Sequence, residues 1–279
     1  MLLRRLQRLS TAVALPQEPS VLRWAVGGWS FFIAENVVLS HNRGALIEAL
    51  QDESTYHALY GTVSTVATAS IGYAYLFKVR GAEPLQWALG AAPPLWRLAL
   101  GFGLQAFGLA AIAQRLPKLQ VPVTAAPSSA SGEGAVQQPS GGLRVQCPFD
   151  FGDKGSSDGP GPHGLSRVTR HPGFWSLGTV CLGAAVAVPS VPQALWLCGP
   201  AMVALIGGAH ADFRHRRGMG GSLSAELDAS TSNVPFAAML SGAQGGVAEA
   251  FTALTQELKL SNASLGAAVA LWLAVRRVR

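Results

Sequence analysis

The sequence predicts an all-α protein, a multi-pass transmembrane helical bundle with about five or six spans. Hydrophobic residues make up 49% of the 279 residues, charged residues only 13%, and the mean hydropathy is +0.29. A soluble domain carries about 25% charged residues. The apolar residues are also spread over several long segments instead of one core-sized block. We therefore expect one membrane domain over residues 21–279.

Charge and cysteine content argue against other classes of protein. The net charge is +6, but the cations lie between apolar segments without interleaved aromatic residues, which disfavours a nucleic-acid-binding surface. Cys147, Cys181 and Cys198 are far apart, and two of them lie in apolar segments. This spacing indicates packing residues, with neither a disulfide framework nor a CxxC metal site.

The first twenty residues resemble an organellar transit peptide. They contain Arg4, Arg5 and Arg8 but no acidic residue before Glu18, and their leucines fall on one helical face. A mitochondrion and a plastid fit this pattern equally well, so we expect an organellar integral membrane protein. An ordinary N-terminus on the membrane surface is the alternative.

Six apolar segments are the candidate spans, since a span needs about 20 residues. They are residues 22–39, 58–77, 94–113, 174–188, 194–209 and 265–275. The turn at residues 189–192, Pro-Ser-Val-Pro, predicts that the fourth and fifth form an antiparallel pair. The sixth is short, and it either spans with help from its neighbours or lies in the interface. Residues 119–160 form a low-complexity loop to which we assign no function.

Six crossings would place the loops after the first, third and fifth spans on one side of the membrane. All the histidines would share that side: His41, His57, His163, His171, His210 and His215. The Lys and Arg residues divide into eleven on this side and ten on the other, so the positive-inside rule gives no orientation.

Residues 167–175, Arg-Val-Thr-Arg-His-Pro-Gly-Phe-Trp, form the most informative motif. Arg167, Arg170 and His171 precede Pro172, which is suited to the first turn of a helix. A helix N-terminus beside cations is suited to bind an anion or a cofactor. Basic residues that only anchor a helix at the interface are the alternative.

Two further clusters on the same side carry candidate functional residues. Glu35 lies among aromatic residues near the end of the first span and is followed by His41; an ionisable group at such a depth is a functional candidate, and a hydrogen-bonded structural residue is the alternative. Residues 207–217 contain His210 four positions before Arg214, and then Arg216 and Arg217. His210 suits a metal ligand, a heme ligand or an acid–base group, as well as a structural role.

These motifs resemble the NnrU membrane family, which includes 15-cis-zeta-carotene isomerase. The resemblance lies in residues 167–172 (Arg-Val-Thr-Arg-His-Pro), 208–212 (Gly-Ala-His-Ala-Asp), 216–217 (Arg-Arg) and 231–240 (Thr-Ser-Asn-Val-Pro-Phe-Ala-Ala-Met-Leu), in this order. Residues 56–64 resemble the entry of the family's second helix. The likeness covers about residues 24–244, the low-complexity loop excepted.

The resemblance implies an integral membrane protein that acts on an apolar small molecule such as a carotenoid, and for the isomerase branch a heme b cofactor. The isomerase's own ligand positions hold Glu35, Asn36 and Val37 in one helix and Ala204 and Leu205 in the other. The resemblance therefore implies displaced ligands. The candidate residues are His41 and His210 as axial ligands, Arg167, Arg216 and Arg217 for cofactor binding, and Glu35, Arg170 and His171 for catalysis.

Two alternative functions remain open. Arg170, His171 and the aromatic residues after them also resemble a motif of membrane methyltransferases, in which Arg216 or Glu226 would complete a site for S-adenosylmethionine. The third possibility is a non-catalytic accessory protein that binds heme or lipid.

Overall fold

The computed structural model describes residues 19–81, 94–115, 123–125, 143–145 and 161–278, and these residues are almost entirely helical. The all-α prediction is confirmed. A short antiparallel pairing of β1 (Val123–Ala125) with β2 (Leu143–Val145) is the exception among the described residues, and both strands fall within the predicted low-complexity loop. The other residues of that loop up to residue 160, and the predicted transit peptide up to residue 18, lie outside the described residues.

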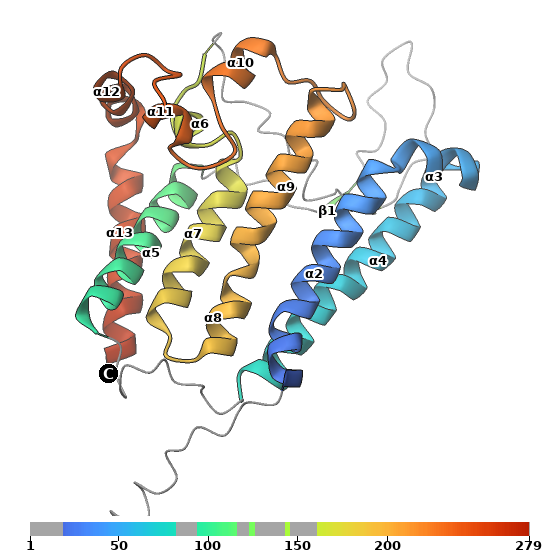
Figure 1. The fold of residues 1–279 in the computed structure, drawn as a ribbon, viewed down its shortest axis with the longest axis horizontal. Helices are drawn as coiled ribbons and strands as arrows, with labels where there is room; N and C mark the ends of the chain where they lie inside the picture. The colour runs from blue at the N-terminus through green and yellow to red at the C-terminus, as the bar shows by residue number, and fades with distance from the viewer. Residues whose placement is uncertain (1–18, 82–93, 116–122, 126–142, 146–160, 279) are drawn as a thin grey trace, which may run out of the picture.

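The N-terminal part is a helical hairpin. α2 (Pro19–His41) and the short α3 (Arg43–Leu50) lead to α4 (Glu53–Tyr73), which continues as a π-helical turn, η1 (Ala74–Val79). Asp52 caps α4 because its carboxylate accepts hydrogen bonds from the backbone N–H groups of Ser54 and Thr55. Figure 1 shows this hairpin leaning against the rest of the bundle.

Four longer helices and one short one form the rest of the bundle: α5 (Leu95–Arg115), α7 (Pro172–Ala187), α8 (Val191–Leu197), α9 (Gly199–His215) and α13 (Leu260–Val278). Glycines set the close approach of α5 and α7. A Cβ atom on Gly101 would lie 2.7 Å from the carbonyl oxygen of Gly183, and one on Gly108 would lie 2.7 Å from that of Ser176. The predicted turn at residues 189–192 is present, so α7 and α9 are antiparallel as expected.

Four short helices close one end of the bundle. They are α6 (Leu165–Val168), α10 (Ala225–Ser230), α11 (Ala237–Leu240) and α12 (Val247–Glu257). In Figure 1 they gather at the top, above α5, α7 and α13, and the last turn of α9 ends beside them. We call this the polar end. The opposite end, where α8 and η1 lie, is called the α8 end.

The prediction of five or six spans was too high. In the part of the chain that the structure describes, two helical segments are long and apolar enough to cross a membrane, Leu95–Arg115 and Val191–His215. A third would be the pair Val247–Glu257 and Leu260–Arg276, which is bent by 88°. Three predicted spans fall short for physical reasons: α2 contains Arg23 and Glu35, α4 is rich in Ser and Thr, and α7 has only 16 residues.

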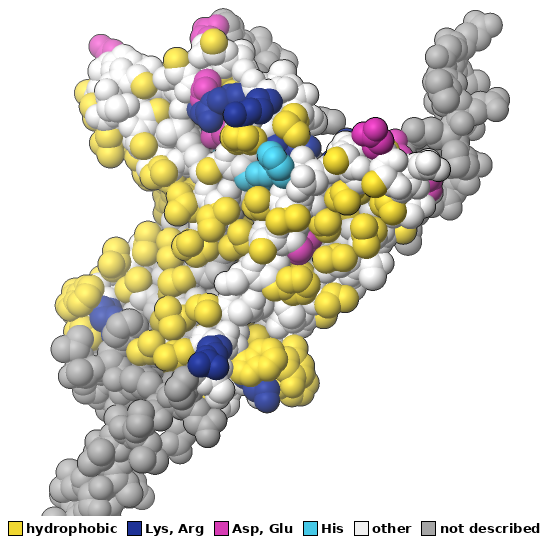
Figure 2. Space-filling view, turned by 45° about the vertical axis from the view of Figure 1, so that its right-hand side comes forward, with side chains coloured by type: hydrophobic (Ala, Val, Ile, Leu, Met, Phe, Trp, Pro, Cys, Tyr) yellow, Lys and Arg dark blue, Asp and Glu magenta, His cyan; other side chains and the backbone are white. Residues whose placement is uncertain are grey.

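Large hydrophobic side chains are nevertheless exposed along most of the helices, including those that fall short of a span by composition. Val38 on α2 is 55% exposed, Val66 on α4 55%, and Leu177 on α7 52%. Figure 2 shows that hydrophobic side chains cover much of the face between the two ends. A soluble monomer rarely exposes so much apolar surface.

Candidate functional site

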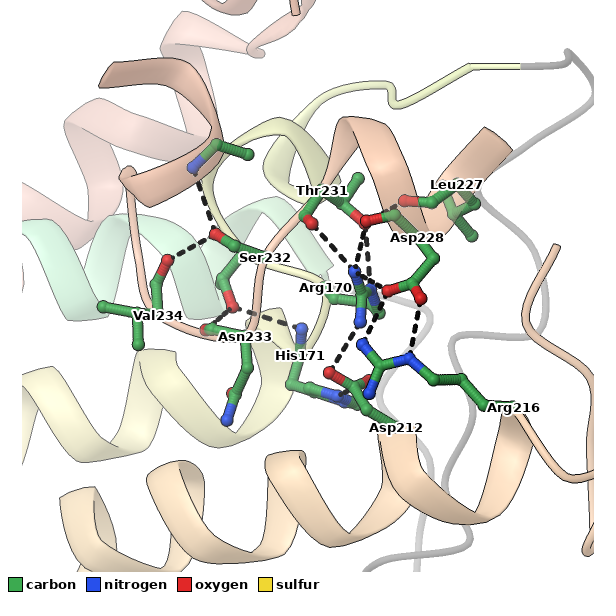
Figure 3. Close-up of polar contacts among 12 residues, drawn as sticks. Arg170, His171, Asp212, Arg216, Leu227, Asp228, Thr231, Ser232, Asn233 and Val234 are labelled. Atoms are coloured by element: carbon green, nitrogen blue, oxygen red, sulfur yellow. Dashed lines mark hydrogen bonds and ion pairs between the residues drawn. The ribbon is translucent and has the colours of Figure 1, made fainter. Parts of the chain in front are cut away.

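The polar end contains a buried cluster centred on Arg170, which lies two residues before α7 (Figure 3). All three nitrogens of its guanidinium donate hydrogen bonds. Nη1 donates to Asp212 Oδ2 at 2.6 Å, and Nε donates to Thr231 Oγ1 at 2.9 Å. Nη2 donates to the carbonyl oxygens of Thr231 and Asp228 and lies 2.9 Å from Asp228 Oδ1. The Arg170 cluster therefore joins the start of α7 to the end of α9 and to α10.

His171 completes the pairing of Asp212. Its Nε2 lies 2.8 Å from Asp212 Oδ1, while Arg170 occupies the other oxygen. The side chains of Arg170, His171 and Asp212 are 9%, 11% and 6% exposed. A buried carboxylate with a partner on each oxygen is the arrangement expected of a structural ion pair.

Arg216 extends the Arg170 cluster towards the surface. It donates from Nε and from Nη2 to the two oxygens of Asp228, at 2.6 and 2.7 Å. This hydrogen-bonded pair with Arg216, supported by the charge of Arg170, holds the pKa of Asp228 below its ordinary value. Asp228 thus links an exposed cation to a buried one.

The backbone beside Arg170 also pairs with the segment before α11. The Arg170 N–H donates to the carbonyl oxygen of Ser232, and the Phe236 N–H donates to that of Val168 at 2.7 Å. Asn233 accepts a hydrogen bond from Trp175 Nε1 at 3.0 Å and donates to the carbonyl of Leu205. These bonds fix residues 231–236 across the ends of two helices.

Gly208 allows this packing. A Cβ atom at Gly208 would overlap Asn233 Oδ1 and would lie 2.9 Å from His171 Cδ2. Three sequence segments that carry the NnrU resemblance therefore meet here: the first contributes Arg170 and His171, the second Gly208 and Asp212, and the third Asn233.

Two predicted cofactor-binding residues lie outside the Arg170 cluster. Arg167 forms a separate pair with Glu257 of α12, with contacts of 2.8 and 2.6 Å. Arg217 is exposed and lies over the ring of Phe213, 3.5 Å from its centroid. The structure therefore does not bring Arg167 and Arg217 to one site with Arg170.

Glu35 belongs to a second buried cluster, between α2 and α4. Its Oε1 accepts hydrogen bonds from Ser64 Oγ at 2.8 Å and from Asn36 Nδ2 at 2.5 Å. Tyr60 donates to Asn36 Oδ1. We call Glu35, Asn36, Tyr60 and Ser64 the Glu35 network.

One atom of the Glu35 network lacks a partner. Glu35 is 6% exposed, and its Oε2 is buried with no hydrogen-bond partner among the described residues. Buried polar atoms are nearly always hydrogen-bonded, so such an exception calls for an explanation such as a reactive role or a ligand. Glu35 Oε2 is therefore a candidate functional atom.

The two proposed heme ligands, His41 and His210, lie close to each other, and Ser40 contacts one of them. The rings of His41 and His210 are 6.1 Å apart between centroids, with an angle of 51° between their planes. Ser40 Oγ lies 2.7 Å from His210 Nε2, so a direct contact between α2 and α9 occupies that nitrogen. Iron at that atom would have to displace the Ser40 hydroxyl. Heme binding therefore remains a prediction from the resemblance.

Sequence reasoning gave no role to the residues that complete both clusters. Asp228 and Thr231 supply most of the partners of Arg170; Thr231 lay in the noted segment 231–240, whereas Asp228 lay in no noted motif. Tyr60 and Ser64 are four residues apart on α4 and so lie on one helical face, a spacing that could have indicated partners for α2. Asp212 was part of a noted motif, but its role becomes visible only when α7 and α9 meet.

The described residues contain no group of three or more His, Cys, Asp or Glu side chains that could hold a metal ion. Comparison of the chain with family models, with curated proteins and with solved structures finds no match.

Proposed function

We propose that this chain is an integral membrane protein of the NnrU type that binds an apolar polyene and isomerises one of its cis double bonds. The proposal rests on one observation above the others: Glu35 Oε2 is buried without a partner among the described residues, between two helices whose outer surfaces are apolar. The convergence of the three resembling segments at the Arg170 cluster supports the family part of the proposal.

The position of Glu35 suits a long apolar substrate. An α-helix rises about 1.5 Å per residue, so Glu35 lies roughly 16 Å along α2 from Trp24 and roughly 9 Å from His41. A polyene dissolved in the bilayer would reach this depth without crossing the polar end. Ser64 and Asn36 hold the carboxyl group through Oε1, which leaves Oε2 to meet the substrate.

A carboxyl group can isomerise a conjugated double bond without a redox cofactor. In its protonated form, Glu35 would add its proton to one carbon of the double bond, and the positive charge would spread along the polyene. The former double bond is then single and rotates. Return of a proton from the same carbon to the carboxylate restores the double bond in the trans form. No net proton or electron is consumed.

Isomerisation in cells that accumulate a cis polyene tests the proposal. We expect wild-type protein to raise the trans-to-cis ratio measured by chromatography, and Glu35→Gln to lower the rate about 100-fold, since general acid catalysis is typically worth at least that factor. The glutamine amide keeps an oxygen that can accept from Ser64. Glu48→Gln, at an exposed position on α3, is the matched control and should retain full activity.

Other outcomes would overturn parts of the proposal. Equal rates for wild type and Glu35→Gln would remove the catalytic role of Glu35. An apolar lipid that co-purifies without isomerisation would favour the accessory function. Binding of S-adenosylmethionine would favour a methyltransferase, although all three guanidinium nitrogens of Arg170 are already engaged. A Soret band that disappears in His210→Ala and His41→Ala would support the heme prediction.

A further inference from the structure

The two ends of the bundle differ in net charge. A count of Lys and Arg alone does not show this difference, because acidic side chains offset the cations at one end. At the polar end, the described residues include equal numbers of basic and acidic side chains. The basic ones are Arg43, Arg115, Arg167, Arg170, Arg214, Arg216, Arg217 and Lys259, and the acidic ones are Glu48, Asp52, Glu53, Asp212, Glu226, Asp228, Glu249 and Glu257. That end therefore has no formal net charge from the described residues.

The α8 end has only cations among the charged side chains that the structure describes. They are Arg23 of α2, Lys78 of η1, Arg80, Arg97 of α5 and Arg276 of α13. Arg97 is buried and donates to the carbonyl oxygens of Val186 and Val188, at the end of α7. The other four are exposed or half-buried. In Figure 2, Lys and Arg side chains appear at this end, whereas most acidic side chains lie at the other end.

Aromatic side chains accompany these cations. Lys78 Nζ lies 5.8 Å from the ring centroid of Trp24, and the guanidinium of Arg276 lies 4.5 Å from that of Trp272. Trp96, next to Arg97, is 63% exposed. Trp residues are enriched at membrane–water interfaces because their rings are apolar and carry one polar N–H group.

We infer that the α8 end is a binding surface for anionic phospholipid headgroups, with Arg23, Lys78 and Arg80 as its principal contacts. Lys78 and Arg80 are two residues apart, and η1, which contains Lys78, packs against α2, which contains Arg23. Trp24 also packs against Tyr73, at the end of α4. The surface continues directly from the exposed apolar faces of α2 and α4, so headgroups would meet the cations while the acyl chains cover those faces. This surface is independent of the proposed isomerisation.

Lipid retention measures this binding. Full-length protein in detergent is mixed with equal amounts of phosphatidylcholine and phosphatidylglycerol, and the bound lipids are quantified by mass spectrometry. We expect enrichment of phosphatidylglycerol on the wild type, and a decrease in about 0.5 M NaCl because salt screens exposed charges. Arg23→Gln/Lys78→Gln/Arg80→Gln should lower the enrichment by about fivefold for each cation removed, the factor that corresponds to about 1 kcal/mol per basic residue at an anionic surface.

Two matched variants separate charge from folding. Arg23→Lys/Lys78→Arg/Arg80→Lys keeps the charges and should keep the enrichment. Arg43→Gln/Arg217→Gln/Lys259→Gln removes three cations from the polar end and should also keep it. The inference is overturned if the wild type shows no enrichment, if the neutral variant at the α8 end retains it, or if the polar-end variant loses it to the same extent.

Discussion

The Arg170 cluster and the Glu35 network are both buried and polar, but they differ in how completely their carboxyl groups are paired. In the first, both oxygens of Asp212 have charged or ionisable partners. In the second, Glu35 has two neutral donors on one oxygen and, among the described residues, none on the other. A fully paired charge cluster fixes helices relative to one another, whereas a buried carboxyl oxygen without a partner calls for a further explanation. The difference favours a structural role for the Arg170 cluster and supports the catalytic role that we propose for Glu35.

The largest effect should follow from removal of Arg170. Arg170→Ala leaves Asp212 buried with only His171, and it also removes the donor to the carbonyl oxygens of Asp228 and Thr231. Removal of one partner of a buried ion pair typically costs about 3–5 kcal/mol. Thermal unfolding in detergent, followed by circular dichroism, should show a large decrease in unfolding temperature.

Arg217→Ala is the control for this change, because Arg217 is exposed and stacks on Phe213 outside the Arg170 cluster. It should alter the stability by less than about 1 kcal/mol. If Arg170→Ala unfolds at the same temperature as Arg217→Ala, the cluster does not hold the polar end together.

A smaller effect is expected at Gly208, where no charge is changed. Gly208→Ala places a methyl group against Asn233 and His171 and forces α9 away from them. Overpacking of this kind usually costs about 1–3 kcal/mol. Gly103→Ala in α5 is the matched control, since a Cβ atom there meets nothing within 4 Å. Equal unfolding temperatures for the two variants would contradict the close packing at Gly208.

The helices could largely be predicted from the sequence, and the pairing of their ends could not. The apolar segment at residues 94–113 corresponds to α5, and the prolines at 189 and 192 mark the turn between α7 and α8 because proline and apolar length act locally. Asp228 lies 58 residues from Arg170, and the folded arrangement of three helices brings them together. The span count was too high because it gave too little weight to the charges of α2, the Ser and Thr residues of α4 and the short length of α7, all of which the sequence shows.

Acid should weaken the outer part of the Arg170 cluster. The pKa of Asp228 is lower in the folded protein than in the unfolded chain, so its ionised form contributes stability above its ordinary pKa near 3.8. That contribution is lost as the pH falls through the lowered value. Unfolding temperatures between pH 6 and pH 3 should fall less for Asp228→Asn than for the wild type. Parallel curves for the two proteins would show that Asp228 does not take part.

The smallest change in stability is expected for Glu35→Gln. This variant also gives the clearest contrast with Arg170→Ala. The amide oxygen can still accept from Ser64, and no ion pair is broken because both donors to Glu35 among the described residues are neutral. We therefore expect an unfolding temperature close to that of the wild type, within the equivalent of about 1 kcal/mol. Arg170→Ala should lower stability through lost structure, whereas Glu35→Gln should lose isomerisation in a protein that remains folded. A strongly destabilised Glu35→Gln protein would instead indicate that the Glu35 network, like the Arg170 cluster, has a structural role.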